Sequence, residues 1–373
     1  MGVYHKNMFA LLNKEIFELK LTVATGCNLR CDYCFVDKNR ANQEMTLETA
    51  QKSIEFFLGS KGKDKILKIY GGEPLLNFEV IKKAVFYAKK TARKKNKNLT
   101  LSLCTNAVLL NPVHVDFFKK NKFQLAISFD GSKQTHDKFR KFPNGTGTFD
   151  KITENFKFLF KNINRRDMAA NMAVVPSEAK NMFKNFKYIL NTGFDTLNIE
   201  PIYGFEKWTI NKHKQFQKEM ESIISFIVSQ IYKKKFIFLT TVNRELKYKT
   251  LSKLKNGVCL FHQFPEIYPD GRIGFSSFFL NLPEGTQPRY IIGNVNQGRI
   301  ENKYKNCVYS NKSKKCQNCW ENYFNLPDES MSSKIVEIRN LLSIELANYI
   351  QQMAQNNPIF REYINEVKKH ICF

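Results

Sequence analysis

Three cysteines lie close together near the start of the chain, at Cys27, Cys31 and Cys34. Thiolates are the usual protein ligands of iron–sulfur clusters, and four of them normally fill the iron sites of a cube. A group of three thiolates would hold three corners of a [4Fe–4S] cluster and leave the fourth iron open to a molecule from outside. The spacing therefore predicts a cluster that binds a small molecule directly.

Other interpretations of these cysteines stay open. A lone cysteine is usually a buried apolar residue. The two-residue gap between Cys31 and Cys34 would also suit zinc, although no His or Cys follows nearby as a fourth ligand. The chain shows no signal peptide, and its nine cysteines fall mostly in short motifs. This usage indicates a reducing cytoplasm and metal binding rather than a disulfide scaffold.

The pattern Cys27-x3-Cys31-x2-Cys34, with Tyr33 before the last cysteine, resembles the signature of the radical S-adenosylmethionine (SAM) enzymes. The resemblance implies that the amino and carboxylate groups of SAM chelate the open iron. One electron from the reduced cluster would then break a C–S bond of SAM and release a 5′-deoxyadenosyl radical. An external low-potential electron donor of the flavodoxin or ferredoxin type is expected, and Tyr33 would lie near the adenine.

The composition limits the class of protein. Of 373 residues, 43% are hydrophobic, which is ample for the core of an enzyme-sized protein. No apolar stretch approaches the roughly 18–20 residues of a membrane span. The net charge of +25 could indicate a nucleic-acid partner. Because Lys falls mostly singly or in pairs along the whole chain, we favour solvated helix faces, or attraction of an acidic peptide substrate, over nucleic acid.

Short β-like runs alternate with helix-like runs from residue 17 to about residue 200. The predicted strands are residues 17–23, 66–70, 99–104, 123–129, 168–175 and 196–199. The predicted helices are residues 47–58, 78–95, 112–119, 149–160 and 181–190. Strands separated by helices imply parallel pairing with right-handed crossovers. An open doubly wound sheet would show the same alternation, and the family resemblance selects an α/β fold built as a partial (β/α)6 barrel.

Polar motifs follow the predicted strands at the ends where α/β barrels carry their reactive residues. Gly71-Gly72-Glu73-Pro74 follows the second strand and by itself would be a turn. It resembles the Gly-Gly-Glu-Pro motif of the radical SAM family, which contacts the amino group of SAM. Glycine lets the backbone approach a ligand closely, and a carboxylate is the natural acceptor for an ammonium group.

A second block follows the fourth predicted strand. Ser128-Phe129-Asp130-Gly131 with His136-Asp137-Lys138-Phe139-Arg140 resembles the Ser-x-Asp-Gly…His-Asp-x-x-Arg pattern of the radical SAM enzymes that modify peptides and proteins. The resemblance implies that Ser128 contacts the ribose of SAM and that Arg140 binds its carboxylate, which the planar guanidinium suits. Asp130 and His136 are expected to fix this loop. Without the cysteines, the block would be interpreted as a turn and an exposed basic helix.

Four more cysteines, Cys259, Cys307, Cys316 and Cys319, lie in the last third of the chain. The Asp270-Gly271 step between the first two predicts a β-hairpin. This layout resembles the SPASM/twitch extension, which implies one auxiliary [4Fe–4S] cluster held by the four cysteines. Zinc is the alternative metal, since four thiolates suit it equally well.

The extension departs from the full seven-cysteine pattern, because Ser276, followed by Ser277, stands where that pattern has a cysteine, and the later cysteine run stops after Cys319. We therefore expect one auxiliary cluster rather than two. Cys372 could replace Cys307 if the tail folds back, and Cys104 is interpreted as a core residue.

The predicted organisation is a radical SAM barrel at residues 1–205, a helical linker that leaves the barrel at 206–250, the cysteine-rich domain at 251–330, and a C-terminal helical segment at 331–373. The apolar stripe of that last segment, which includes Ile335 and Leu346, is expected to pack on the barrel. Sixteen residues precede the first strand, too few for a leader-recognition domain, so we expect substrate capture by the barrel, the cysteine domain or a separate leader-peptide-binding protein.

The leading functional hypothesis is a cytoplasmic radical SAM maturase of a ribosomally made peptide. Its product would be a thioether or carbon–carbon crosslink, or an epimerised residue. The nearest competing hypothesis is an anaerobic sulfatase-maturating enzyme that makes formylglycine, and Ser276 and Ser277 count against it. Two further hypotheses are a small-molecule radical SAM dehydrogenase and a basic nucleic-acid-binding protein with a structural metal.

Overall fold

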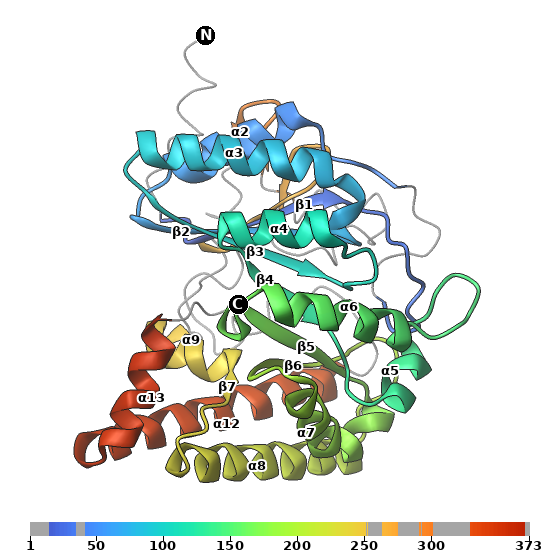
Figure 1. Ribbon diagram of the computed structural model, residues 1–373, viewed down its shortest axis with the longest axis vertical. Helices are drawn as coiled ribbons and strands as arrows, with labels where there is room; N and C mark the ends of the chain where they lie inside the picture. Colours follow the sequence, from blue (N-terminus) through green and yellow to red (C-terminus); the bar gives the residue numbers. More distant parts are fainter. Residues whose placement is uncertain are drawn as a thin grey trace.

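A parallel β-sheet with helices between its strands forms the centre of the computed structural model, which describes residues 15–34, 42–250, 252, 263–274, 291, 293–300 and 329–369 (Figure 1). The parallel strands are β1 (Glu18–Ala24), β2 (Asp64–Gly71), β3 (Asn98–Thr105), β4 (Gln124–Ser128), β5 (Met168–Val174), β6 (Thr196–Pro201) and β7 (Phe238–Leu239). They lie in chain order, and each pairs with the next. This confirms the predicted partial (β/α)6 barrel.

Helices connect successive strands and cover the outer side of the sheet (Figure 1). They are α2 (Leu47–Gly59), α3 (Phe78–Lys94), α4 (Pro112–Asn121), α5 (Lys133–Phe139), α6 (Phe149–Asn162), α7 (Met182–Thr192) and α8 (Ile210–Tyr232), with short 3-10 turns at η1 (Pro74–Asn77), η2 (Arg165–Asp167) and η3 (Pro176–Asn181). Helices α2, α3, α4, α6 and α7 begin and end within two residues of the bounds predicted for them. Helix α5 is not among the predicted helices, because its seven residues are too few to show a clear helical period.

Local signals explain where these helices begin. Thr46 accepts a hydrogen bond from the Thr49 backbone N–H at 3.1 Å and caps α2. Asn111 caps α4 in the same way through the His114 N–H, and Pro112 occupies the first turn, where its missing N–H costs nothing. Helices α2 and α4 therefore each begin directly after the loop that follows a strand.

Helix α8 corrects the expectation that residues 206–250 leave the barrel as a linker. After α8 the chain returns to the sheet, where β7 pairs in parallel with β6. The stripe of α8 that includes Phe216, Met220 and Ile223 is buried, which holds the helix against the barrel. The reason for the error is that β7 has only two residues, too few to show a strand period in the sequence.

Helix α9 (Thr240–Tyr248) follows β7 and reaches β1, the first strand of the barrel. Arg244 of α9 places its Nη2 atom 2.8 Å from the Glu18 carboxylate on β1. The Tyr248 ring also packs edge-to-face against Phe17, with 5.0 Å between the ring centroids. Among the described strands, β7 and β1 do not pair with each other, and α9 connects them instead.

The predicted hairpin at Asp270-Gly271 is present and lies beside β1. Strand β8 (Glu266–Ile267) pairs in parallel with β1, and β9 (Arg272–Gly274) turns back along β8. Gly271 has φ of +85°, a left-handed conformation that favours glycine. Strands β10 (Gly293–Asn294) and β11 (Arg299–Ile300) extend this edge. The expected auxiliary ligands Cys259, Cys307, Cys316 and Cys319, as well as Cys372, lie outside the described residues.

The C-terminal helices α12 (Glu329–Asn356) and α13 (Pro358–Lys369) pack beside α8 and α9 (Figure 1). Ile335 and Leu346 are buried, which confirms that the apolar stripe is a packing surface. Arg339 of α12 forms an ion pair of 2.7 Å with Glu200 near the end of β6. Helix α12 therefore reaches the carboxyl edge of the sheet, although it is far from β6 in sequence.

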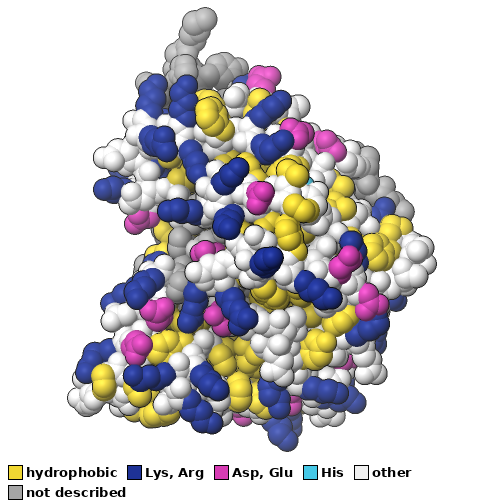
Figure 2. All heavy atoms as spheres, in the orientation of Figure 1, with side chains coloured by type: hydrophobic (Ala, Val, Ile, Leu, Met, Phe, Trp, Pro, Cys, Tyr) yellow, Lys and Arg dark blue, Asp and Glu magenta, His cyan; other side chains and the backbone are white. Residues whose placement is uncertain are grey.

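Figure 2 shows how the positive charge is distributed over one face of the molecule. On the face shown in Figure 2, Lys and Arg side chains are scattered over many elements and mixed with acidic and apolar side chains rather than collected in one stripe. This distribution is that of solvated helix faces. Within the part of the chain that the structure describes, no helix is long and apolar enough to cross a membrane.

The docking of α13 gives a stability prediction. The Tyr363 hydroxyl donates a buried hydrogen bond of 3.0 Å to the Ile237 carbonyl, and its ring stacks on Phe238. Tyr363→Phe should lower the free energy of unfolding by about 1 kcal/mol, because the Ile237 carbonyl loses this donor while the ring contact remains. Urea unfolding of the purified protein measures it. The control Tyr232→Phe, at an exposed position, should change stability by less than about 0.5 kcal/mol. An unchanged Tyr363→Phe would contradict this packing.

Candidate active site

The loop of residues 27–34, which carries the three cysteines, follows β1 and lies against the segment that follows α5. The Arg30 N–H donates to the Lys141 carbonyl, and the Asp32 N–H donates to the Phe139 carbonyl, both at 2.8 Å. The Lys141 ammonium adds an ion pair of 2.8 Å with Asp32. Two motifs separated by about a hundred residues in the sequence are thus joined by backbone hydrogen bonds.

The sulfur atoms of this loop lie in a largely buried environment. Burial raises the pKa of the Cys27 thiol to about 12 and that of Cys31 to about 11. Cys27 Sγ accepts from the Leu29 backbone N–H at 3.4 Å and from the Asn106 side-chain amide at 3.7 Å. Buried thiols become thiolates when a metal displaces their protons, and N–H donors to a ligating sulfur tune the potential of a cluster. The donor set therefore fits a metal cluster.

Among the described residues, no three His, Cys, Asp or Glu side chains form a group that could hold a single metal ion. In an iron–sulfur cube each thiolate binds a different iron, so the three sulfurs need not share one centre. The expected cluster on Cys27, Cys31 and Cys34 stays a prediction.

Glycines at the end of β2 fit tightly against the start of the cysteine loop. The Gly72 N–H donates to the Ala24 carbonyl and the Glu73 N–H donates to the Gly26 carbonyl, both at 2.9 Å. A Cβ atom at Gly71 would lie 2.4 Å from the Ala24 carbonyl oxygen, and one at Gly72 would lie 2.3 Å from that of Gly26. Only glycine lets the two loops approach this closely.

Glu73 is completely buried and accepts three hydrogen bonds. The donors are the Leu75 N–H at 3.1 Å, the Thr105 hydroxyl at 2.7 Å and the Asn106 N–H at 2.8 Å. Burial nevertheless raises the pKa of Glu73 to about 7. The carboxylate fixes the loop after β3, including Asn106, whose amide reaches Cys27. Its expected contact with the amino group of SAM stays a prediction.

Asp130, just after β4, joins three other parts of the site. Its carboxylate accepts from the Tyr33 hydroxyl at 2.6 Å, from Arg140 Nε at 2.9 Å and Nη2 at 3.0 Å, and from the Ala173 N–H at 2.9 Å. The Arg140 guanidinium also lies over the Tyr33 ring, 5.4 Å from its centroid. The structure therefore brings the predicted residues Tyr33 and Arg140 together. Because two nitrogens of Arg140 bind Asp130, its expected contact with the SAM carboxylate stays a prediction.

His136 supports this loop from behind. Its Nδ1 atom lies 3.4 Å from the Asp130 backbone N–H, and its Nε2 atom lies 3.1 Å from the Thr148 hydroxyl. Burial lowers the pKa of His136 to about 4, so the ring is neutral at physiological pH. As expected from the sequence, Asp130 and His136 fix the loop.

Ser128 and Cys104 lie further inside the barrel. Ser128 ends β4 in register with Asn171 of β5. The Asn171 side-chain amide lies 3.3 Å from Cys104 Sγ. Cys104, expected in the core, packs with the small side chains Ala126 and Ala169 in a cluster separate from the main core. The alternation along β3, in which Cys104 shares a face with the polar Ser102, could have indicated this.

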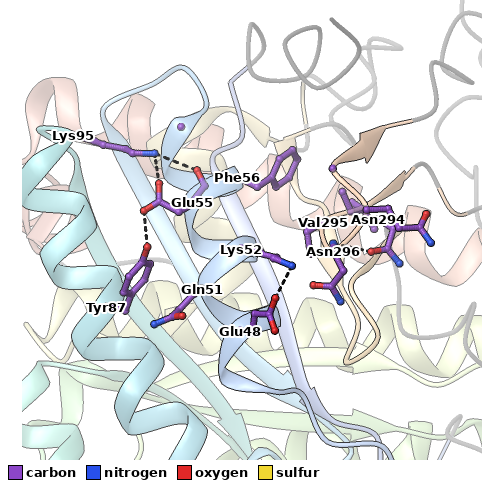
Figure 3. A pocket seen from close by; sticks show the side chains of 14 residues that line it. Glu48, Gln51, Lys52, Glu55, Phe56, Tyr87, Lys95, Asn294, Val295 and Asn296 are labelled. Atoms are coloured by element: carbon purple, nitrogen blue, oxygen red, sulfur yellow. Dashed lines mark hydrogen bonds and ion pairs between the residues drawn. The ribbon is translucent and has the colours of Figure 1, made fainter. Parts of the chain in front are cut away.

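A groove of about 760 Å³ lies away from this site, between α2 and the turn that joins β10 and β11 (Figure 3). Its charged side chains satisfy one another: Lys52 pairs with Glu48 at 2.8 Å, and Lys95 pairs with Glu55 at 2.6 Å. None of the predicted site residues lines it. We therefore place the chemistry at the cysteine loop rather than in the groove.

The close approach at Gly72 gives the first prediction for the site. Gly72→Ala should push the Glu73 motif away from the cysteine loop, because the added carbon meets backbone atoms that cannot rotate aside. The iron content and the visible absorbance of anaerobically reconstituted protein should fall well below those of the wild type. Gly145→Ala is the control, since its added carbon would meet nothing within 4 Å and the variant carries only the backbone strain of its φ of +83°. Equal loss in both variants would contradict the proposed fit.

The raised pKa of Glu73 gives a pH prediction. Between the unfolded pKa near 4.5 and the folded pKa near 7, the unfolded state ionises first, so the free energy of unfolding falls as the pH rises. From pH 5.5 to 8.5 the wild type should lose about 2 kcal/mol from this group. Glu73→Gln should remove that slope, in addition to a constant loss from its weaker hydrogen bonds. Urea unfolding of SAM-free protein at both pH values tests it, and parallel slopes would refute it.

The comparisons with known proteins agree with this geometry. Residues 21–187 match the family described as the Radical SAM superfamily. The chain is 29% identical over 197 residues to the cysteine-type anaerobic sulfatase-maturating enzyme of Clostridium novyi (strain NT), which covers 50% of this chain and 51% of the relative. The chain spans about half the length of the curated relatives it matches.

Two solved structures share the fold. One is native anSMEcpe with bound AdoMet and Kp18Cys peptide, with a TM-score of 0.69 and 22% identity over 89% of this chain and 99% of that one. The other is Streptococcus suis SuiB bound to precursor peptide SuiA, with a TM-score of 0.56 and 13% identity over 83% of this chain and 70% of that one. At these identities the likeness shows the fold alone. Residues 21–187 nevertheless match the Radical SAM superfamily, and this part of the chain is a radical SAM domain.

Proposed function

We propose that the protein is a radical SAM enzyme that abstracts a hydrogen atom from a peptide and installs a modification in it. The observation that carries the proposal is the junction of the cysteine loop with Asp130 and Arg140, since this block resembles the pattern of the peptide-modifying branch. A [4Fe–4S] cluster on Cys27, Cys31 and Cys34 would supply the electron that cleaves SAM to a 5′-deoxyadenosyl radical.

The chain's own residues prepare the site for this chemistry. Asp130 orients Arg140 and Tyr33, and Glu73 orients Asn106 toward Cys27. The Tyr33 ring packs against Phe139 and Phe205, which places an aromatic wall beside the cysteine loop. Such a wall keeps water from a reactive intermediate.

A peptide substrate is supported by what similar proteins bind. SuiB was solved with the precursor peptide SuiA and anSMEcpe with the Kp18Cys peptide, and both share this fold. We propose a thioether or carbon–carbon crosslink, or an epimerised residue, as the product. Cys259, Cys307, Cys316 and Cys319 would hold an auxiliary [4Fe–4S] cluster that binds the substrate or takes up an electron. A low-potential electron donor and a separate leader-peptide-binding protein complete the proposal.

Sulfatase maturation is the second candidate. Similarity to a cysteine-type sulfatase-maturating enzyme over 197 residues favours it. Ser276 and Ser277, where the full extension carries a cysteine, count against it. The two candidates share the radical chemistry and differ in the product.

The central experiment measures 5′-deoxyadenosine. Anaerobically reconstituted protein should release it from SAM when a strong reductant is added. Cys31→Ala should abolish the release, because the cube loses a ligand, and should lower the iron content. Cys104→Ser, which removes a thiol outside the cysteine loop, should keep the iron content. A wild-type protein that binds zinc at this loop, or releases no 5′-deoxyadenosine, would exclude the proposed function.

Mass spectrometry separates the products. Candidate peptides from open reading frames beside the gene, and a sulfatase peptide with Cys or Ser at the modified position, are incubated with SAM and reductant in D₂O. A crosslink removes hydrogen from the peptide, and epimerisation adds deuterium to one carbon. Conversion of the sulfatase peptide to formylglycine would select the second candidate instead.

A further inference from the structure

The strand registers place five side chains in one row across the barrel. Lys20 of β1 lies beside Glu266 of β8 on one side and Lys68 of β2 on the other. Lys68 is in register with Ser102 of β3, and Ser102 is in register with Gln124 of β4. We name these five residues the inner row.

The inner row faces the interior of the barrel rather than the helices. Side chains alternate between the two faces of a strand. Leu67 and Leu101, next to the inner row in sequence, belong to the main core. Ala126 and Ala169, which share the inward face, form a separate cluster. The five side chains are therefore on the face that a substrate inside the barrel would meet.

Among the described residues, two neighbouring members of the inner row have a side-chain oxygen without a hydrogen-bond partner, and Lys68 beside them has only a distant ion-pair partner. Within the described part of the chain, neither Ser102 Oγ nor Gln124 Oε1 has one, although these residues are only 2% and 5% exposed. The Lys68 ammonium lies 3.7 Å from the nearest Glu18 carboxylate oxygen, which is too far for a hydrogen bond. Buried polar groups in folded proteins are normally paired, so this stretch of the row is prepared for a polar ligand.

The charge around the inner row favours an anion. Glu266 pairs with Lys20 at 3.3 Å, and Glu18 pairs more closely with Arg244, at 2.8 Å, than with Lys68. Three cations, Lys20, Lys68 and Arg244, therefore face the two carboxylates of Glu18 and Glu266. Lys68 is the cation that lies farthest from its carboxylate partner. Burial also lowers the pKa of Lys68, which shows that its charge is poorly compensated.

Solvent reaches this part of the barrel. The side chains of Lys20 and Lys68 keep 27% and 17% of their exposure although they point inward. The next positions toward the cysteine loop include Ala126 and Ala169, two of the smallest side chains. A small group can therefore approach Lys68 and Ser102 from the strand ends.

We propose that the inner row binds a carboxylate group of the substrate, held by Lys68, Ser102 and the side-chain amide of Gln124. An amide can turn its N–H₂ group toward an anion. Lys68 lies three residues before Gly71 on β2. Because a strand rises about 3.3 Å per residue, the bound substrate carboxylate would lie about 10 Å along the barrel from the site at the strand ends. The inference rests on the proposed function in that the carboxylate belongs to the molecule modified there.

The test measures binding without SAM or reductant, so it succeeds or fails independently of radical chemistry. Reconstituted full-length protein is titrated with sodium propionate, with its neutral isostere propionamide and with sodium chloride at matched ionic strength, and the melting temperature is recorded. Propionate should raise the melting temperature in a saturable way, and propionamide and chloride should not. In Lys68→Met and Ser102→Ala the apparent Kd for propionate should rise by at least about tenfold, because a charge-assisted hydrogen bond is lost.

Lys52→Met is the matched control, because Lys52 is a lysine outside the barrel that is already paired with Glu48. It should respond to propionate like the wild type. If Lys68→Met does not fold, the milder variant Ser102→Ala provides the test.

A pentapeptide with blocked ends and a central Asp, compared with its Asn counterpart, tells whether the carboxylate is carried by a peptide or by a small molecule. Equal responses in wild type and variants, or no saturable response, would overturn the proposal and leave buried water as the occupant.

Discussion

The carboxylate of Asp130 is the interaction on which the site depends. It binds the guanidinium of Arg140, the hydroxyl of Tyr33 and a backbone N–H of β5, and all of these contacts are at least partly buried. A buried ion pair is costly to form and still more costly to break, because removal of one partner leaves the other charge desolvated. This pair therefore holds the cysteine loop and the ends of β4 and β5 in one arrangement.

Burial has a second effect on the same site. It raises the pKa values of Cys27, Cys31 and Glu73, so these groups resist ionisation until positive charge arrives. Iron and the ammonium of SAM are the positive groups that the family resemblance implies. The site is thus electrostatically incomplete without them, while its hydrogen bonds already fix the geometry. Preorganisation of this kind lowers the cost of binding and of reaction.

The interior of the barrel, away from the strand ends, also contains polar groups that lack partners within the part of the chain that the structure describes. Lys20, Lys68 and Ser102 occupy inward positions where a closed barrel usually carries branched apolar side chains. Their polarity has a structural cost, since Ser102 has no hydrogen-bond partner among the described residues. A ligand that enters the barrel would remove that cost.

The sequence by itself determined the parallel strands, the helices and the site motifs, because each depends on neighbours close in the chain. The alternation at β1 to β6, the glycines at Gly71 and Gly72 and the spacing of Cys27, Cys31 and Cys34 are local patterns. Only the tertiary structure decided that β7 joins the sheet, that Asp130 occupies two nitrogens of Arg140, and that Cys104 and Lys68 face the interior. These features depend on residues brought together from distant parts of the chain, and strand register is not encoded in any single segment.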